Sequence, residues 1–235
     1  MRTLGLIGGM TWHSTVDYYR LINAGVQARL GGSHSAELVM VSVDFGPIED
    51  MQGRGDWEAM GRLMAGAART LESAGAEGII ICANTMHRLA DDVLAAVRIP
   101  FIHIADAAAA EVKRAGIGTI GLLGTRYTME LDFYRGRLEQ EHGLEVLIPE
   151  EPGRTAVHDI IYKELAFGDI RDGSRRTYVA IIEDLKKRGA QGVILGCTEI
   201  PLLIQEKDSP LPVFDTTALH AAAAVEFALC CSLSS

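Results

Sequence analysis

The feature that most constrains the fold is an internal duplication, in which three short motifs recur in the same order. The paired segments, 112 to 116 residues apart, are LGLIG at 4–8 with IGLLG at 120–124, GAEGIII at 75–81 with GAQGVIL at 189–195, and IPFI at 99–102 with LPVF at 211–214. Gly-Ala and Ile-Pro recur in many α/β folds, which accounts for one such match but not for three at nearly constant spacing. The chain therefore reads as two similar units of about one hundred residues each.

Short apolar runs rich in β-branched residues alternate with longer helical patterns, which is typical of a parallel α/β sheet. We expect strands near residues 2–8, 37–43, 77–82, 99–104, 117–124, 143–148, 191–196 and 211–214. Helical patterns fill the gaps, as at 14–29, 57–74, 130–142 and 174–188, and in the Ala-rich tail at 218–231. The predicted domains are 1–105 plus 216–235 and 106–215, because the tail is expected to pack back onto the first unit.

Ligands of parallel sheets bind beyond the carboxyl ends of the strands. The duplication predicts two α/β domains related by a pseudo-two-fold axis, with a ligand cleft between them. Residues at equivalent strand ends would then approach one ligand from opposite sides, which suits chemistry on both faces of one carbon.

The two strand-end motifs ICANTMH and LGCTEI each contain a cysteine, but the two cysteines are out of step. With a shift of 114 residues, Cys197 falls on Ala83 and Cys82 falls on Gly196. Consecutive strand residues point to opposite faces, so a slip of one place is a large displacement for a side chain. The register thus pairs a thiol with a methyl group, and Cys82 is interpreted as a small buried hydrophobe.

Cys197 ends a predicted strand and precedes Thr198, Glu199 and Pro201, and a proline suits the first turn of a helix. A helix N-terminus stabilises a thiolate, so we expect a lowered pKa at Cys197. The same N–H groups, with hydroxyls such as those of Thr198 and Thr85, suit a carboxylate ligand. A buried inert cysteine is the alternative interpretation.

Composition excludes several classes of function. A net charge of -9 and the absence of a basic patch argue against a nucleic-acid partner. The N-terminal segment MRTLGLIGGM predicts a strand rather than a signal peptide, and no apolar stretch reaches the roughly 18 residues of a membrane span. Four cysteines, including the adjacent pair Cys230 and Cys231, lack metal-site spacing and fit reduced thiols in a cytoplasmic protein.

Cofactors are not expected either. The five lysines stand mostly in charged helical surroundings and none ends a strand, whereas a pyridoxal phosphate enzyme needs a Schiff-base lysine. The Gly-rich start lacks the dinucleotide-binding spacing. The seven histidines show no metal-ligand spacing, so His87 and His103 are predicted to be structural hydrogen-bonding residues.

The segments LGLIGGM, ANTMH, LLGTRYTM and GCTEI, in this order, resemble those of the aspartate/glutamate racemase family over essentially the whole chain. Within that family the similarity is greatest to broad-specificity amino-acid racemases acting on aspartate, glutamate or related substrates. The resemblance implies a cofactor-independent proton transfer, in which one residue at each strand end serves one face of the substrate α-carbon. It also implies an amino-acid or dicarboxylate ligand and a homodimer.

The resemblance assigns one acid/base to Cys197 and places Ala83, which has no proton to give, at the second position. Family members carry cysteine, or in some cases threonine, at that position. The resemblance also implies that the substrate's carboxylate and amino groups are bound by Asn84, Thr85, Thr198 and Glu199, that the pocket is lined by Met10 and Gln52, and that further hydroxyl contacts come from Thr125 and Thr128.

Three explanations of Ala83 remain open. The chain is an amino-acid racemase scaffold carrying an engineered substitution that impairs turnover, or a natural one-cysteine relative such as a decarboxylase, or an amino-acid-binding protein without catalysis. The racemase scaffold is the favoured interpretation.

Overall fold

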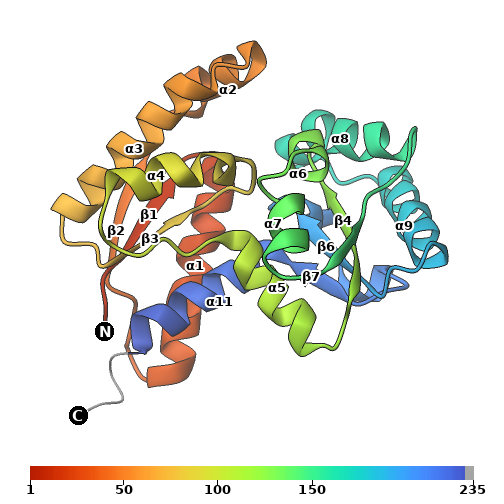
Figure 1. Cartoon of the computed structure of the whole chain (residues 1–235). Coiled ribbons are helices and arrows are strands. Elements are labelled where there is room, and N and C mark those ends of the chain that lie inside the picture. The colour runs from red at the N-terminus through yellow and green to blue at the C-terminus, as the bar shows by residue number, and fades with distance from the viewer. Residues whose placement is uncertain (231–235) are drawn as a thin grey trace. The chain divides into compact units, whose positions relative to one another are not determined.

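A computed structural model describes residues 1–230 of the chain (Figure 1). Contacts divide the chain into two compact units. The first unit comprises Met1–Ile104 and the segment that begins at His220, and the second comprises Ala105–Leu219. Both units are parallel α/β structures, so the predicted fold class is confirmed.

The first unit contains a three-stranded parallel sheet in the order β2-β1-β3. The strands are β1 (Leu4–Gly8), β2 (Leu38–Ser42) and β3 (Gly78–Ile81). The helical segments are α1 (Trp12–Leu30), α2 (Phe45–Arg54), α3 (Trp57–Ser73), η1 (Thr85–Leu89), α4 (Ala90–Ala96) and α11 (Thr216–Leu229), the last belonging to this unit from His220 onward. Every residue of β1 and β3 is buried, which explains why both strands read as continuous apolar runs.

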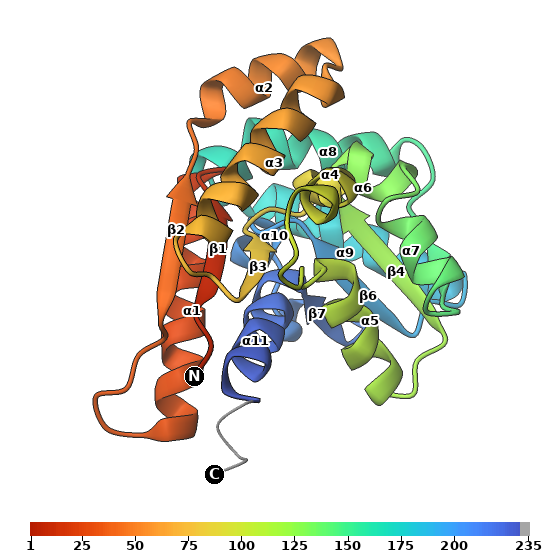
Figure 2. The ribbon, with the colours of Figure 1, turned by 60° about the vertical axis from the view of Figure 1, so that its left-hand side comes forward.

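Alternate residues of β1 and β3 enter two separate cores in the first unit. Ile79 and Ile81 pack with residues of α3, whereas Ile80 and Leu6 pack with residues of α1 and α11. The sheet is therefore covered on both faces (Figures 1 and 2).

The second unit contains a four-stranded parallel sheet in the order β5-β4-β6-β7. The strands are β4 (Thr119–Gly124), β5 (Glu145–Leu147), β6 (Gly192–Gly196) and β7 (Val213–Asp215). The helical segments are α5 (Ile104–Arg114), α6 (Arg126–Glu130), α7 (Arg135–Gln140), α8 (Gly153–Lys163), η2 (Leu165–Phe167), α9 (Asp172–Lys187), α10 (Ile200–Leu203) and η3 (Glu206–Asp208). As in the first unit, the first strand lies between the second and the third.

Two predicted elements are wrong. The strand expected at 99–104 is reduced to a single bridge between Phe101 and Ile79, because Pro100 has no N–H to donate and α5 begins at Ile104. The helix expected at 130–142 is broken into α6 and α7. At Leu131 the backbone becomes extended, and the segment that follows buries Tyr134 completely.

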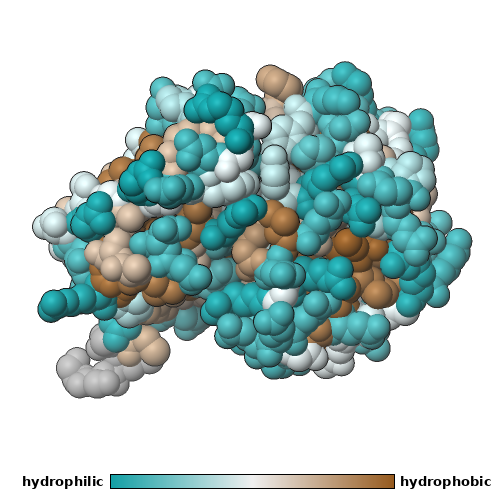
Figure 3. All heavy atoms as spheres, turned by 45° about the horizontal axis from the view of Figure 1, so that its top comes forward, coloured by the Kyte–Doolittle hydropathy of each residue, from teal (hydrophilic) through white to brown (hydrophobic). Residues whose placement is uncertain are grey.

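Hydrophilic residues predominate on the face shown in Figure 3, with apolar residues in small groups between them. Within residues 1–230, no helix combines the length and the apolar composition that crossing a bilayer requires. Cys82, Cys197 and Cys230 are free thiols, whereas Cys231, the second member of the adjacent pair, lies outside the described residues.

Candidate active site

In the first unit, the predicted site residues other than Gln52 lie just beyond the carboxyl ends of neighbouring strands. Ile7 of β1 is paired with Ile81 of β3, so the segments that follow both strands leave the same edge of the sheet. Met10 follows β1 and Ala83 follows β3, and both side chains belong to the same buried cluster. Gln52 lies on α2 and is likewise buried.

Cys82 and Ala83 leave β3 toward opposite faces. Ala83 continues the series Ile79 and Ile81 into one core, whereas Cys82 packs with residues of α1 and α11 in the other. Burial raises the pKa of the fully buried Cys82 thiol, so it stays protonated. Cys82 therefore has the environment of a small buried hydrophobe, as its sequence position predicted.

The turn after β3 carries Asn84 and Thr85, and its carbonyl groups accept hydrogen bonds in succession. The Ser14 hydroxyl donates to the Cys82 carbonyl over 3.1 Å. The His87 ring Nδ1 donates to the Ala83 carbonyl over 2.8 Å, and the His87 backbone N–H donates to the Asn84 carbonyl over 3.1 Å. These bonds connect the turn to α1 on one side and to η1 on the other.

In the second unit, glycines allow the ends of β4 and β6 to lie close together. Gly124 is paired with Gly196, and a Cβ atom on Gly124 would lie 2.9 Å from the Gly196 carbonyl oxygen. Cys197 follows Gly196 directly and belongs to the same core as Val193 and Leu195 of β6. Cys197 comes two residues after the core residue Leu195 of β6, just as Ala83 comes two residues after the core residue Ile81 of β3. The two residues therefore hold corresponding positions after their strands.

The Cys197 thiol is engaged by the residues that follow it. Its Sγ donates to Oε2 of Glu199 over 2.9 Å, and the Thr198 hydroxyl donates to the same oxygen over 2.7 Å. Glu199 is thus the common acceptor of two neighbouring protons. Cys197 and Thr198 are therefore connected through the carboxylate of Glu199.

The expectation of a lowered pKa at Cys197 is wrong. Burial raises the pKa of this thiol well above its ordinary value, and the negative Glu199 carboxylate raises it further. Backbone hydrogen bonds from Glu199 and Thr198 act in the opposite direction but are outweighed. The helix that follows, α10, has only four residues and begins at Ile200, so its N-terminus contributes little.

Thr125 and Thr128 are held at the end of β4. Thr125 is the N-cap of α6, where its hydroxyl accepts the Thr128 backbone N–H over 3.3 Å. The two hydroxyl oxygens lie 3.2 Å apart. Both residues are buried. They lie directly after β4, where the sequence placed them.

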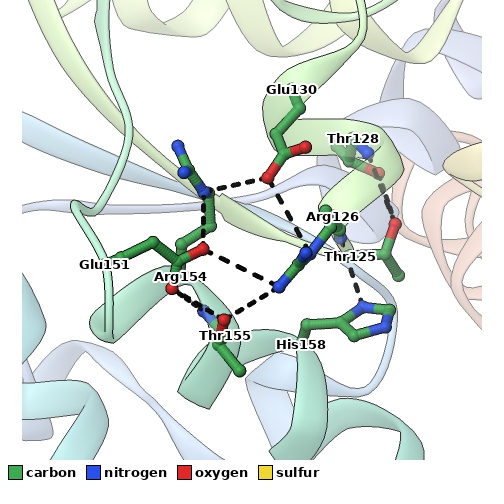
Figure 4. Close-up of polar contacts among 8 residues, drawn as sticks. All are labelled: Thr125, Arg126, Thr128, Glu130, Glu151, Arg154, Thr155 and His158. Carbon is green, nitrogen blue, oxygen red and sulfur yellow. Dashed lines mark hydrogen bonds and ion pairs between the residues drawn. The ribbon is translucent and has the colours of Figure 1, made fainter.

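Sequence reasoning missed a network of charged residues that joins this loop to α8 (Figure 4). Arg126 donates to the Thr155 hydroxyl over 2.8 Å, and the Arg126 backbone N–H donates to Nδ1 of His158 over 3.3 Å. Arg154 lies 2.9 Å from Glu130 and 3.3 Å from Glu151. Burial lowers the pKa of His158, and the Arg126 cation lowers it further.

No signal in the sequence marks this network, because its members are brought together only by the packing of α6 on α8. Within the described residues, no group of three or more histidine, cysteine, aspartate or glutamate side chains is arranged to hold a metal ion.

The sequence model of the Asp/Glu/hydantoin racemase family matches residues 7–224. The chain therefore belongs to the Asp/Glu/hydantoin racemase family. It is 55% identical to a putative Asp/Glu racemase from Yersinia pestis, over 97% of this chain and 100% of that one, with a TM-score of 0.93.

Two further relatives agree with this classification. An aspartate racemase homologue from Pyrococcus horikoshii is 38% identical over 97% of this chain and 99% of that one, with a TM-score of 0.83. The broad specificity amino-acid racemase RacX of Bacillus subtilis is 22% identical over 94% of this chain and 96% of that protein.

Proposed function

We propose that the chain is a cofactor-independent amino-acid racemase scaffold acting on aspartate, glutamate or a related amino acid, with Cys197 as its one acid/base. The observation that carries the proposal is the partly buried hydrogen bond from the Cys197 thiol to Glu199 at the carboxyl end of β6. Membership of the racemase family supports the reaction class. The substrate-binding roles of Met10, Gln52, Asn84, Thr85, Thr198, Glu199 and Thr125 are part of the same proposal.

The proposed chemistry needs no group besides those of the chain and the substrate. Glu199 accepts the thiol proton, and the Cys197 thiolate then takes the α-proton of the amino acid, leaving a carbanion next to the substrate carboxylate. The thiol proton then exchanges with solvent, and its return to the carbanion restores the thiolate and gives the amino acid with a solvent proton on its α-carbon. A thiol with a raised pKa is a strong base once deprotonated, which suits the removal of a weakly acidic C–H proton.

Inversion requires a second acid/base for the opposite face of the α-carbon, and Ala83 occupies the position at which family members carry one. The methyl group of Ala83 has no proton to give. The unmodified chain is therefore expected to exchange the α-proton of one enantiomer with solvent and to return it on the same face.

The test is to incubate each enantiomer of aspartate and of glutamate with the protein in D2O and to follow the α-proton by NMR. We expect deuterium incorporation into one enantiomer with retained configuration. A Cys197→Ser variant should lose roughly 10²- to 10⁴-fold in exchange rate. The matched control is Cys230→Ser, because Cys230 is an exposed free thiol at the end of α11.

Rapid racemisation by the unmodified chain would contradict the proposal, as would unchanged exchange in Cys197→Ser. A decarboxylase, which Ala83 favours as the alternative, would release CO2 from a malonate-type substrate. A binding protein would be stabilised by ligand without any exchange.

The resemblance to the family also supports a homodimer, which sedimentation equilibrium would measure. The scarcity and spacing of its cysteines support a cytoplasmic location, which fractionation of the source cells would test.

A further inference from the structure

Three histidine rings are buried together in the first unit, beneath the turn that follows β3. The exposed fractions of the residues His87, His103 and His220 are 1%, 5% and 0%. The His87 ring lies edge-on to both of the others, with centroid distances of 4.7 Å to His103 and 5.4 Å to His220. The cluster connects η1 with α11 and with the segment after Phe101.

Hydrogen-bond partners fix the tautomers of two of these rings. A carbonyl oxygen has no hydrogen, so Nε2 of His220 must donate to the Ile102 carbonyl, 2.8 Å away. Its Nδ1 then accepts from the Tyr18 hydroxyl, also at 2.8 Å. By the same reasoning, Nδ1 of His87 carries the proton, because its partner is the Ala83 carbonyl.

The other ring nitrogen of His87, Nε2, is buried and has no hydrogen-bond partner in the part of the chain described. Burial holds the pKa of His87 well below its ordinary value, and the neighbouring rings of His103 and His220 lower it further. These are the titratable groups that act on it from the segment after Phe101 and from α11. An unsatisfied buried acceptor costs free energy of folding, so the presence of a histidine at position 87 needs an explanation.

The explanation we propose, which rests on the proposed function, is that His87 is a positioning residue for the racemase site. Two of the three successive carbonyl groups of the turn, those of Ala83 and Asn84, accept their hydrogen bonds from His87. The ring thereby holds the backbone carbonyl of residue 83, the position of the second acid/base, while the His87 backbone N–H holds that of Asn84. His87 acts through the carbonyl groups and touches no reacting atom.

The test compares two amide replacements that place the donor differently. The side-chain nitrogen of asparagine can take the place of Nδ1, so His87→Asn keeps a donor for the Ala83 carbonyl. The longer side chain of His87→Gln places its amide near the position of Nε2 and removes that donor. Both variants lose the imidazole ring and gain an amide of equal polarity. A difference between them therefore reports the hydrogen bond to the Ala83 carbonyl rather than the loss of the ring.

In the D2O exchange assay, we expect His87→Gln to lower the turnover of exchange at least roughly tenfold, with a smaller change in KM. His87→Asn should recover most of that loss. Equal losses in two well-folded variants would overturn the proposal, because a packing role alone does not distinguish the two amides.

A second measurement does not depend on activity. Long-range ¹H–¹⁵N correlation spectra of the histidine rings in the unmodified chain should show His87 neutral and protonated at Nδ1 at neutral pH. The backbone amide signals of Asn84 and Thr85 should shift more in His87→Gln than in His87→Asn. A ring protonated at Nε2 would overturn the inference, whereas this spectrum without any exchange activity would overturn only the proposed function.

Discussion

At the scale of single residues, the environment of Cys197 is the finding that most changes the interpretation of the sequence. The position of the thiol before a helix suggested a lowered pKa, but burial and the Glu199 carboxylate raise it. The carboxylate that disfavours the thiolate is also the acceptor of its hydrogen bond. In the proposed reaction, Cys197 and Glu199 therefore act as one acid/base unit.

The pairing predicts that removing the charge of Glu199 makes Cys197 more acidic. In Glu199→Gln the negative charge next to the thiol is lost, so the pKa of Cys197 should fall while burial keeps it above the ordinary value. Alkylation of Cys197 by iodoacetamide, followed at the level of the peptide by mass spectrometry across pH, measures this directly. The midpoint should move to lower pH than in the unmodified chain.

The matched control for that substitution is Glu183→Gln, which removes an exposed carboxylate on α9 in the same unit. Its alkylation midpoint should equal that of the unmodified chain. An unchanged midpoint in Glu199→Gln would show that the carboxylate has no electrostatic influence on the thiol.

At the scale of elements, small residues at strand ends allow helices to begin close to the sheet. A Cβ atom on Gly8 would lie 2.4 Å from Cγ2 of Thr15 on α1. The Thr15 hydroxyl accepts the Gly9 N–H over 2.8 Å and donates to the Thr11 carbonyl over 3.0 Å. The glycine therefore allows the hydrogen bonds that connect the end of β1 with the start of α1, next to Met10.

Gly8→Ala is predicted to destabilise the protein by about 1–3 kcal/mol, because the methyl group displaces Thr15 in a packed core. The matched control is Gly53→Ala on α2, where an added Cβ has no neighbour within 4 Å. A glycine in a helix is less favourable than alanine, so this variant should gain about 0.5–1 kcal/mol. Urea unfolding midpoints measure both, and equal stability of the two variants would exclude close packing at Gly8.

The sequence predicted elements well where periodicity is local and less well where contacts between elements decide the structure. The apolar runs of β1, β3, β4 and β6 are buried on both faces, so their continuous apolar sequences predicted strands correctly. At the break between α6 and α7 the chain buries Tyr134, a contact between elements that no local pattern reveals.

The same distinction applies to the site. The register of Cys82 and Ala83 could be predicted because it depends only on the alternation of a strand, and the two side chains do enter different cores. The network of Arg126, Arg154 and His158 and the cluster of buried histidines depend on packing between distant segments. They could therefore not be read from spacing.

At the scale of the whole molecule, buried titratable groups predict a limited pH range of maximal stability. The pKa of His87 is lowered in the folded state, so below about pH 6.5 the unfolded chain binds a proton that the folded chain does not, and stability is lost as pH falls. The pKa values of Cys82, Cys197 and Tyr178 are raised by burial. Above about pH 8.5 the unfolded chain therefore loses protons first, and stability falls as pH rises.

Urea midpoints measured across pH should consequently be highest between these limits. In His87→Asn the urea midpoint should fall less steeply toward low pH than in the unmodified chain, because the buried imidazole is gone. Its fall toward high pH should be unchanged. An equally steep fall toward low pH in the two proteins would contradict the assignment of His87 as a buried neutral ring.

The most direct test of the whole account is to restore an acid/base at position 83 and measure inversion. The Ala83→Cys and Ala83→Thr variants should racemise aspartate or glutamate, followed by circular dichroism from each pure enantiomer, and the gain over the unmodified chain should be roughly 10²-fold or more. The unmodified chain should exchange the α-proton without inverting it. Two folded variants that remain inert, or an unmodified chain that racemises as fast as they do, would contradict the claim that Ala83 stands where the second proton-transfer group belongs.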